Sequence, residues 1–298
     1  MRLSRAILAA SILFASSFVQ GSARADERLK VVASFTILAD FVRNIGGDRV
    51  DVVALVGPDA DAHVYTPSPA DAKTIATAKL VVVNGLGFEG WLPRLVKSSG
   101  GTARIVVATD GIVPLKEPPG SHHTVDPHAW QSVPNAKVYV ENIRRALAEV
   151  DPASAESYRA NAARYVAQLD ALDRDVSAMV AKIPEARRKV ISTHGAFGYF
   201  AAAYGVAFVA PQGVSTDSEP SARDLAGIIA QIRKEKIPAI FLENISDPRL
   251  IRRVAAETGA KIGGTLYSDS LTDEKGAAPT YIDMVRHNIK TLQDALDN

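Results

Sequence analysis

The feature that most constrains the fold is an alternation of short apolar runs, rich in β-branched residues, with longer segments of helical periodicity. In the first half of the chain four such runs predict buried strands, at 29–34, 50–56, 80–84 and 103–108. In the second half four more follow, at 189–193, 206–210, 238–244 and 260–268. Strands that alternate with helices form parallel sheets, so we predict an α/β fold with two similar lobes.

A long segment without glycine, and without proline after Pro152, separates the two series of strands. Between 152 and 182 apolar side chains recur every three or four positions, and Pro184 ends the pattern. At 1.5 Å per residue this helix would be about 45 Å long. We predict one rigid backbone helix over 151–183 that joins an N-terminal lobe (26–150) to a C-terminal lobe (184–298). The periodicity is equally consistent with a plain surface helix.

The N-terminus has the organisation of a secretory signal peptide. Arg2 and Arg5 precede an apolar run over 6–19, and the small-residue pattern Ala23-Arg24-Ala25 follows. The run is too short to span a bilayer of about 30 Å. No cysteine lies near the expected cut after Ala25, which argues against a lipid anchor. We therefore predict that residues 1–25 are removed and that the mature chain is free in the periplasm.

Composition narrows the possible chemistry. The chain has no cysteine, which in an oxidising compartment excludes disulfides, thiolate metal sites and cysteine nucleophiles. Removal of residues 1–25 takes away three arginines, and the formal charge falls from +1 to −2. This balance argues against a nucleic-acid partner, which normally requires a basic face.

Four side chains suited to metal binding follow predicted strands. His63 and His128 come after the second and fourth strands, and His194 and Asp269 come after the first and last strands of the second half. Ligands of open α/β sheets bind outside the carboxyl ends of strands, so we expect these four side chains to converge between the lobes. Taken singly, each also has an ordinary explanation, as a surface histidine, a helix-capping histidine (His194) or a turn former (Asp269).

Three acids are candidates for orienting a histidine ring from outside the site, namely Glu243, Glu219 and Asp126. Each is equally well explained as an exposed acid.

The remaining histidines are weaker candidates. His287 lies within a predicted helix and is expected to be a packed or surface residue. His122 and His123 lie in a short polar loop that could bind metal weakly or have no role in binding.

Several segments carry a resemblance to a known family. They include DAHVYTPSPAD (61–71), DPHAWQSVPNAKVYVENI (126–143), STHGAFGYFAAAYG (192–205) and GGTLYSDSL (263–271). With PQGVSTDSEPSARDL, FLENISDPR and YIDMVRHN they resemble the cluster A-I, or TroA-like, metal-binding proteins of ABC importers. The resemblance implies two lobes joined by a rigid helix and one divalent metal ion buried between them. It also implies the ligands His63, His128, His194 and Asp269.

The resemblance bears on the choice of metal. Manganese-specific members tend to have glutamate at the position of His194, and many zinc members keep histidine there. Zinc members also tend to have a long His/Asp-rich loop before the second ligand, of which only GSHH is present here. Three imidazoles and one carboxylate suit four-coordinate zinc. Bidentate binding by Asp269 would admit manganese, so a manganese or dual-metal protein is the alternative.

The resemblance also implies a mode of action. It predicts a monomeric binding protein that delivers Zn²⁺ to an ABC permease and its ATPase subunit, with a periplasmic metallochaperone as a further candidate partner. Because neutral imidazole binds metal, we expect affinity to fall as the pH drops toward the histidine pKa of roughly 6.5.

Two other classes are less consistent with the sequence. A zinc hydrolase normally leaves one coordination position open and often carries HExxH, which is absent here. A surface adhesin would require an anchor, and the lipid-anchor cysteine is missing. We therefore predict no enzymatic activity.

Overall fold

The computed structural model describes residues 28–118 and 123–297. The predicted signal peptide (1–25) and His122 lie outside the described residues. Within them, no helix combines the length and the apolarity that crossing a membrane requires.

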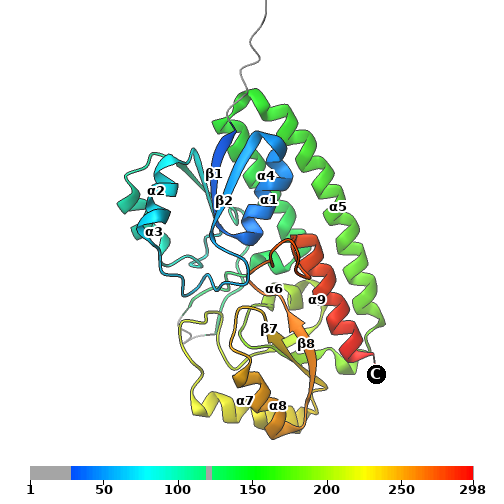
Figure 1. Ribbon diagram of the computed structural model, residues 1–298. Coiled ribbons are helices and arrows are strands. Elements are labelled where there is room, and N and C mark those ends of the chain that lie inside the picture. The colour runs from blue at the N-terminus through cyan, green and yellow to red at the C-terminus, as the bar shows by residue number, and fades with distance from the viewer. Residues whose placement is uncertain (1–27, 119–122, 298) are drawn as a thin grey trace, which may run out of the picture.

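Two four-stranded sheets of the same topology form the centres of the two lobes (Figure 1). Their strand orders are β2-β1-β3-β4 and β6-β5-β7-β8, and every pairing within them is parallel. The first sheet contains β1 (Leu29–Phe35), β2 (Val50–Val56), β3 (Leu80–Val83) and β4 (Arg104–Val107). The second contains β5 (Lys189–Ile191), β6 (Ala207–Val209), β7 (Ala239–Glu243) and β8 (Lys261–Leu266). The predicted α/β fold is confirmed.

Helices cover both faces of each sheet, which explains why the central strands are continuously apolar. In the first lobe Val31 and Ala33 face α1 (Thr36–Gly46) and α4 (Val133–Val150), whereas Val32 faces α2 (Pro69–Thr77) and α3 (Leu92–Ser99). In the second lobe the corresponding layers are α6 (Gly198–Tyr204) with α9 (Tyr281–Leu296), and α7 (Ala222–Glu235) with α8 (Arg249–Thr258).

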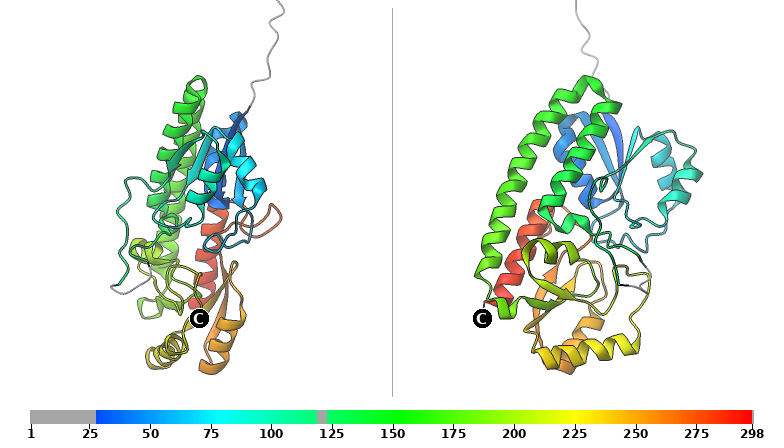
Figure 2. Two further views of the ribbon diagram at one scale, coloured as in Figure 1. Left: turned by 90° about the vertical axis from the view of Figure 1, so that its left-hand side faces the viewer. Right: turned by 180° about the vertical axis from the view of Figure 1, so that it is seen from behind.

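Helix α5 (Ala155–Lys182) runs along the side of both lobes, opposite α2 and α3 (Figure 2). It has 28 residues, which corresponds to about 42 Å. One stripe of the helix is buried against α1 and α4 at one end and α9 at the other, and it consists of Tyr158, Ala162, Tyr165, Leu169, Leu172, Val176 and Val180. The predicted helix is present but begins at Ala155, because residues 152–154 form a 3₁₀ turn.

Two strands end two residues earlier than the sequence predicts, and the reason bears on function. The run 189–193 is a strand only to Ile191, because the backbone N–H of Thr193 donates to the Glu243 carboxylate (2.7 Å) instead of continuing the sheet. Strand β8 likewise ends at Leu266, two residues before Ser268. The carboxyl ends of the strands therefore open into loops directly beside the lobe junction.

Direct hydrogen bonds join the lobes on the side of the junction nearest α9. The backbone N–H of Tyr281 donates to Asp40 (3.0 Å), and the Tyr281 hydroxyl donates to the Trp130 carbonyl (2.7 Å). Trp130 Nε1 and Gln131 Nε2 both donate to the Ser268 carbonyl, at 2.9 and 2.6 Å. These contacts fix the segment after Trp130 against the loop that follows β8.

The buried stripe of α5 yields a stability prediction. Leu172 is 0% exposed, so Leu172→Ala should lower the free energy of unfolding by about 2–5 kcal/mol through lost burial and a cavity. Ser177→Ala, at an exposed position of the same helix, should change it by less than about 0.5 kcal/mol. Denaturant unfolding followed by circular dichroism measures both, and equal effects would contradict the packing of α5.

Candidate metal centre

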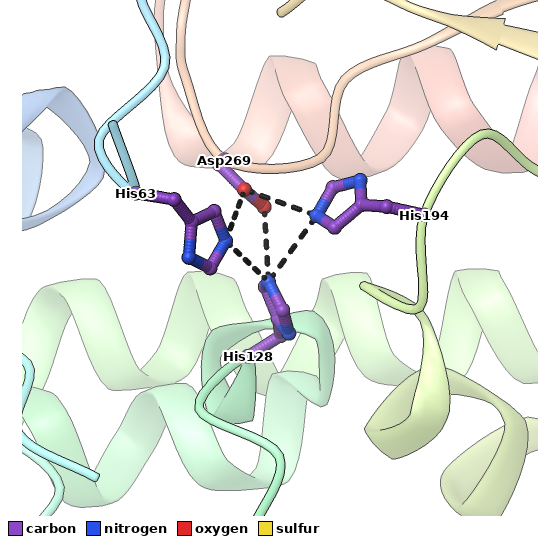
Figure 3. Close-up of side chains that lie close together, drawn as sticks. All are labelled: His63, His128, His194 and Asp269. Atoms are coloured by element: carbon purple, nitrogen blue, oxygen red, sulfur yellow. Dashed lines mark hydrogen bonds and ion pairs between the residues drawn. The ribbon is translucent and has the colours of Figure 1, made fainter. Parts of the chain in front are cut away.

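Four side chains from four different loops meet between the lobes (Figure 3). His63 Nε2 lies 3.2 Å from His128 Nε2 and 3.2 Å from Asp269 Oδ2. His194 Nε2 lies 3.4 Å from His128 Nε2 and 3.2 Å from Asp269 Oδ2. Zinc–nitrogen bonds of 2.0–2.1 Å place tetrahedral ligands about 3.3 Å apart. These four pairs are close to that spacing, and all four ligand atoms lie within 4.8 Å of one another, so one ion can be held by all four residues.

The cluster is closed to water. The side chains of His128, His194 and Asp269 are 0% exposed, and that of His63 is 4% exposed. Each lobe supplies two of the four, since His63 and His128 follow β2 and β4, whereas His194 and Asp269 follow β5 and β8. The strand-end placement expected from the sequence is what the structure shows.

Two buried carboxylates orient two of the rings. Asp126 Oδ1 accepts hydrogen bonds from the backbone N–H of His128 (2.8 Å) and from its Nδ1 (2.7 Å). Glu243 Oε2 lies 2.5 Å from His194 Nδ1, and its Oε1 accepts from the His194 backbone N–H (3.0 Å). A carboxylate only accepts, so both rings carry a proton on Nδ1 and direct Nε2 toward the centre.

Other residues that the sequence singled out lie elsewhere. Glu219 is exposed in the loop before α7, and among the described residues it makes no hydrogen bond to a histidine of the site. His123 lines a surface pocket with Glu117, away from the four-residue cluster. His287 bonds the Thr265 carbonyl (3.0 Å), which fits the expected packing role.

The backbone of the His63 loop is held by a residue that the sequence analysis did not single out. Asp61 Oδ1 accepts from the His63 N–H (2.9 Å), and Asp61 Oδ2 accepts from the Thr216 hydroxyl of the other lobe (2.6 Å). The Asp-x-His spacing recurs in Asp126-x-His128. This repeated spacing is the sequence feature from which the role of Asp61 could have been predicted.

Aromatic side chains support the same loop from the other side. Phe88 packs edge-on against the His63 ring, with centroids 4.7 Å apart. Trp91 Nε1 donates to the Ala62 carbonyl (2.8 Å), and Trp91 packs against Tyr65. The ring of His63 is thus fixed although no carboxylate accepts from its Nδ1 within the described residues.

The pKa shifts of the buried site residues show that the cluster stabilises added positive charge. Burial alone would lower the pKa of His128, but the charge of Asp269 and the hydrogen bond to Asp126 raise it to about 9. Burial is likewise outweighed at His194, where Glu243 and Asp269 raise the pKa well above its usual value. For His63 burial dominates and lowers the pKa.

The pKa shift of Asp269 likewise shows that positive charge beside this carboxylate is favourable. Burial would raise its pKa, but the charges of His194 and His128 hold it well below the usual range. Both of its oxygens are buried, and within the described residues neither makes a hydrogen bond of acceptable geometry although imidazole Nε2 atoms lie at 3.2–3.6 Å. A divalent cation among the three Nε2 atoms would satisfy this carboxylate, so the donor set fits such an ion.

Fold and site together define a class: a two-lobed protein with a buried binding site for a divalent metal ion between its lobes. The family described as "Zinc-uptake complex component A periplasmic" matches residues 31–295. The chain belongs to this family. It is an extracytoplasmic, non-enzymatic metal-binding solute-binding protein of an ABC importer, whose partners are the membrane permease and the ATPase.

Individual relatives cover nearly the whole chain. The chain is 36% identical over 303 residues to the iron-binding protein YfeA of Yersinia pestis, covering 98% of this chain and 97% of that protein. It is 35% identical over 277 residues to the manganese-binding lipoprotein MntA of Halalkalibacterium halodurans, covering 93% and 91%. The relatives are thus named for different metals.

Solved structures of zinc-binding and manganese-bound proteins both resemble this fold closely. The periplasmic zinc-binding protein TroA of Treponema pallidum has a TM-score of 0.87 at 31% identity, covering 91% of this chain and 100% of that one. The manganese-bound periplasmic metal-binding protein from Candidatus Liberibacter asiaticus has a TM-score of 0.82 at 33% identity, covering 90% and 100%.

Proposed function

We propose that this protein captures Zn²⁺ in the periplasm with His63, His128, His194 and Asp269 as ligands and delivers it to its ABC permease. The observation that carries the proposal is the buried set of three imidazoles and one carboxylate whose ligand atoms all lie within 4.8 Å of one another. Zinc favours this ligand number and composition, and four protein ligands leave no position for a catalytic water.

Manganese is the second candidate, and one structural observation favours it. In the part of the chain that the structure describes, both oxygens of Asp269 lack a hydrogen-bond partner, so the carboxylate can bind a metal through both. Manganese prefers more oxygen ligands and a higher coordination number than zinc. Relatives such as MntA of Halalkalibacterium halodurans are named as manganese-binding.

Capture and release follow from where the ligands originate. Because each lobe contributes two ligands, the bound ion joins the lobes, and its release requires at least one ligand loop to move.

We propose lobes at 26–150 and 184–298 around a linking helix at 151–183. We also propose that the protein acts as a monomer and, lacking any cysteine, is unanchored after removal of residues 1–25. A metallochaperone remains a candidate donor of the ion.

A calorimetric titration tests the choice of metal. Metal-stripped protein should bind one Zn²⁺ per chain, and a large excess of Mn²⁺ should leave that binding intact, because three imidazoles favour zinc. Suppression by Mn²⁺ would instead identify a manganese or dual-metal protein. Absence of tight binding by either ion would reject the four-ligand site itself.

Removal of the least buried ligand gives a second test. His63→Ala should weaken zinc binding by more than roughly 100-fold, since loss of a ligand's hydrogen-bond partner alone costs roughly 10- to 100-fold. His287→Ala is the matched control, because it removes a half-buried histidine that bonds a carbonyl outside the site. The circular dichroism spectra of both variants should match that of the wild type. Unchanged affinity in His63→Ala would remove His63 from the site.

The raised histidine pKa values set the pH dependence. In the metal-free site at neutral pH, His128 and His194 carry a second proton, on Nε2, in addition to the one on Nδ1. Metal binding must expel this Nε2 proton from each ring. The apparent affinity should rise with pH across the whole range from 6 to 8 instead of levelling off above the ordinary histidine pKa of roughly 6.5. Titrations in buffers of different ionisation enthalpy measure the released protons. Their absence at pH 7 would contradict these protonation states.

A further inference from the structure

The segment that carries His128 is packed against the first residue of helix α6. Asp126, which orients the His128 ring, is 2% exposed, and its Oδ1 holds both the backbone N–H and Nδ1 of His128. Its second oxygen lies against Gly198. A Cβ atom at Gly198 would stand 2.4 Å from Asp126 Oδ2 and 3.6 Å from Cγ. The carboxylate therefore occupies space that any other residue at position 198 would fill.

The backbone of Asp126 is not free to retreat from α6. Its N–H donates to the Leu115 carbonyl (2.9 Å), and its carbonyl accepts from the Tyr199 hydroxyl (3.0 Å). The same hydroxyl accepts from the Leu115 N–H (3.0 Å). Tyr199 adjoins Gly198 in the chain, so the helix that presents the glycine also fixes the backbone around the carboxylate. A methyl group at 198 would have to displace the carboxylate itself.

Displacement of the carboxylate would release the metal-site histidine. The two oxygens of Asp126 belong to one planar group, so a shift of Oδ2 away from α6 also moves Oδ1 relative to His128 Nδ1. The hydrogen bond of 2.7 Å would then lengthen or break. The ring would lose the partner that fixes its proton on Nδ1 and aims Nε2 at the centre.

The contact also relates the two lobes. Gly198 follows His194 by four residues, whereas Asp126 precedes His128 by two, so the contact links the segments of two proposed ligands. Their Nε2 atoms lie 3.4 Å apart. The close approach of the Asp126 segment to α6 therefore lies beside the two ligands whose Nε2 atoms are this close.

We propose that Gly198 is a positioning residue of the metal site: the absence of a side chain lets Asp126 seat against α6 and hold His128 for the metal. This inference rests on the metal-binding function proposed above. Gly198 itself touches no ion and acts only through Asp126.

The substitution Gly198→Ala tests the proposal. Zinc affinity should fall roughly 10- to 100-fold, the usual effect of losing a ligand's hydrogen-bond partner. Gly227→Ala is the matched control, because Gly227 lies in helix α7 and an added Cβ would meet nothing within 4 Å. Alanine is the better helix former, so helix propensity predicts no loss at either site. Equal affinities of Gly198→Ala and wild type would overturn the proposal.

A double substitution separates positioning from a general structural effect. In the Asp126→Ala background the clashing oxygen is gone, and adding Gly198→Ala should cause no further loss of affinity. Fully additive losses would show that Gly198 acts by another route. Should Gly198→Ala fail to fold, the double variant should recover folding, and failure to recover would also overturn the inference.

A spectroscopic readout makes the test local. In the zinc-loaded protein the Nδ1 protons of His128 and His194 should both be protected from exchange with water in proton–nitrogen NMR spectra. Gly198→Ala should accelerate exchange at His128 alone, because His194 bonds Glu243. Equal acceleration at both rings would contradict a local role. If the wild type did not bind zinc, the proposed function would be rejected. If the wild type bound zinc tightly and Gly198→Ala bound it with the same affinity, only this inference would be rejected.

Discussion

The rest of the structure depends on a buried carboxylate that has no hydrogen-bond donor of good geometry among residues 28–118 and 123–297. Asp269 lies among three imidazole nitrogens in a space closed to water, and its charge is compensated there only by protons on histidine or by a cation. A buried unpaired charge costs several kcal/mol. The lobe junction is therefore an arrangement whose energy depends on which positive charge occupies it.

The surrounding hydrogen bonds hold two of the histidine rings in the orientation that metal binding requires. Asp126 and Glu243 each bind both the ring and the backbone of the histidine that they orient. The ring cannot rotate without breaking bonds to a buried acid, so Nε2 stays aimed at the centre of the site before any metal arrives. Preorganisation of this kind places the ordering cost in folding and not in binding.

The same orienting acids oppose metal binding at low pH. Together with the charge of Asp269, they raise the pKa of His128 and His194 and so make protons effective competitors for the Nε2 positions. The acids that orient the rings thus also favour their protonation, and affinity at periplasmic pH reflects the balance between the two effects. Among the described residues His63 has no such carboxylate on Nδ1, and its lowered pKa leaves it neutral and ready to bind.

Many parts of this picture were accessible from the sequence. Strand β2 was predicted to the residue, because its apolar run is bounded by clear breaks, and all four members of the site were selected by their position after strands. Asp126 and Glu243 were named as orienting acids, but so was Glu219, which is exposed. Sequence position places an acid in a loop without showing which way the loop turns.

What the sequence by itself determined is the local part: the periodicity that forms each helix and strand, and the chemistry of the residues at strand ends. The tertiary structure decided the rest, because distances between segments more than 60 residues apart depend on how the two lobes pack. The separation of His128 from His194 depends on Asp126 meeting a glycine at the start of α6. Asp61 reaches Thr216 only because the lobes close on each other. Such contacts carry no periodic signal, since they arise from packing and not from the preferences of the chain.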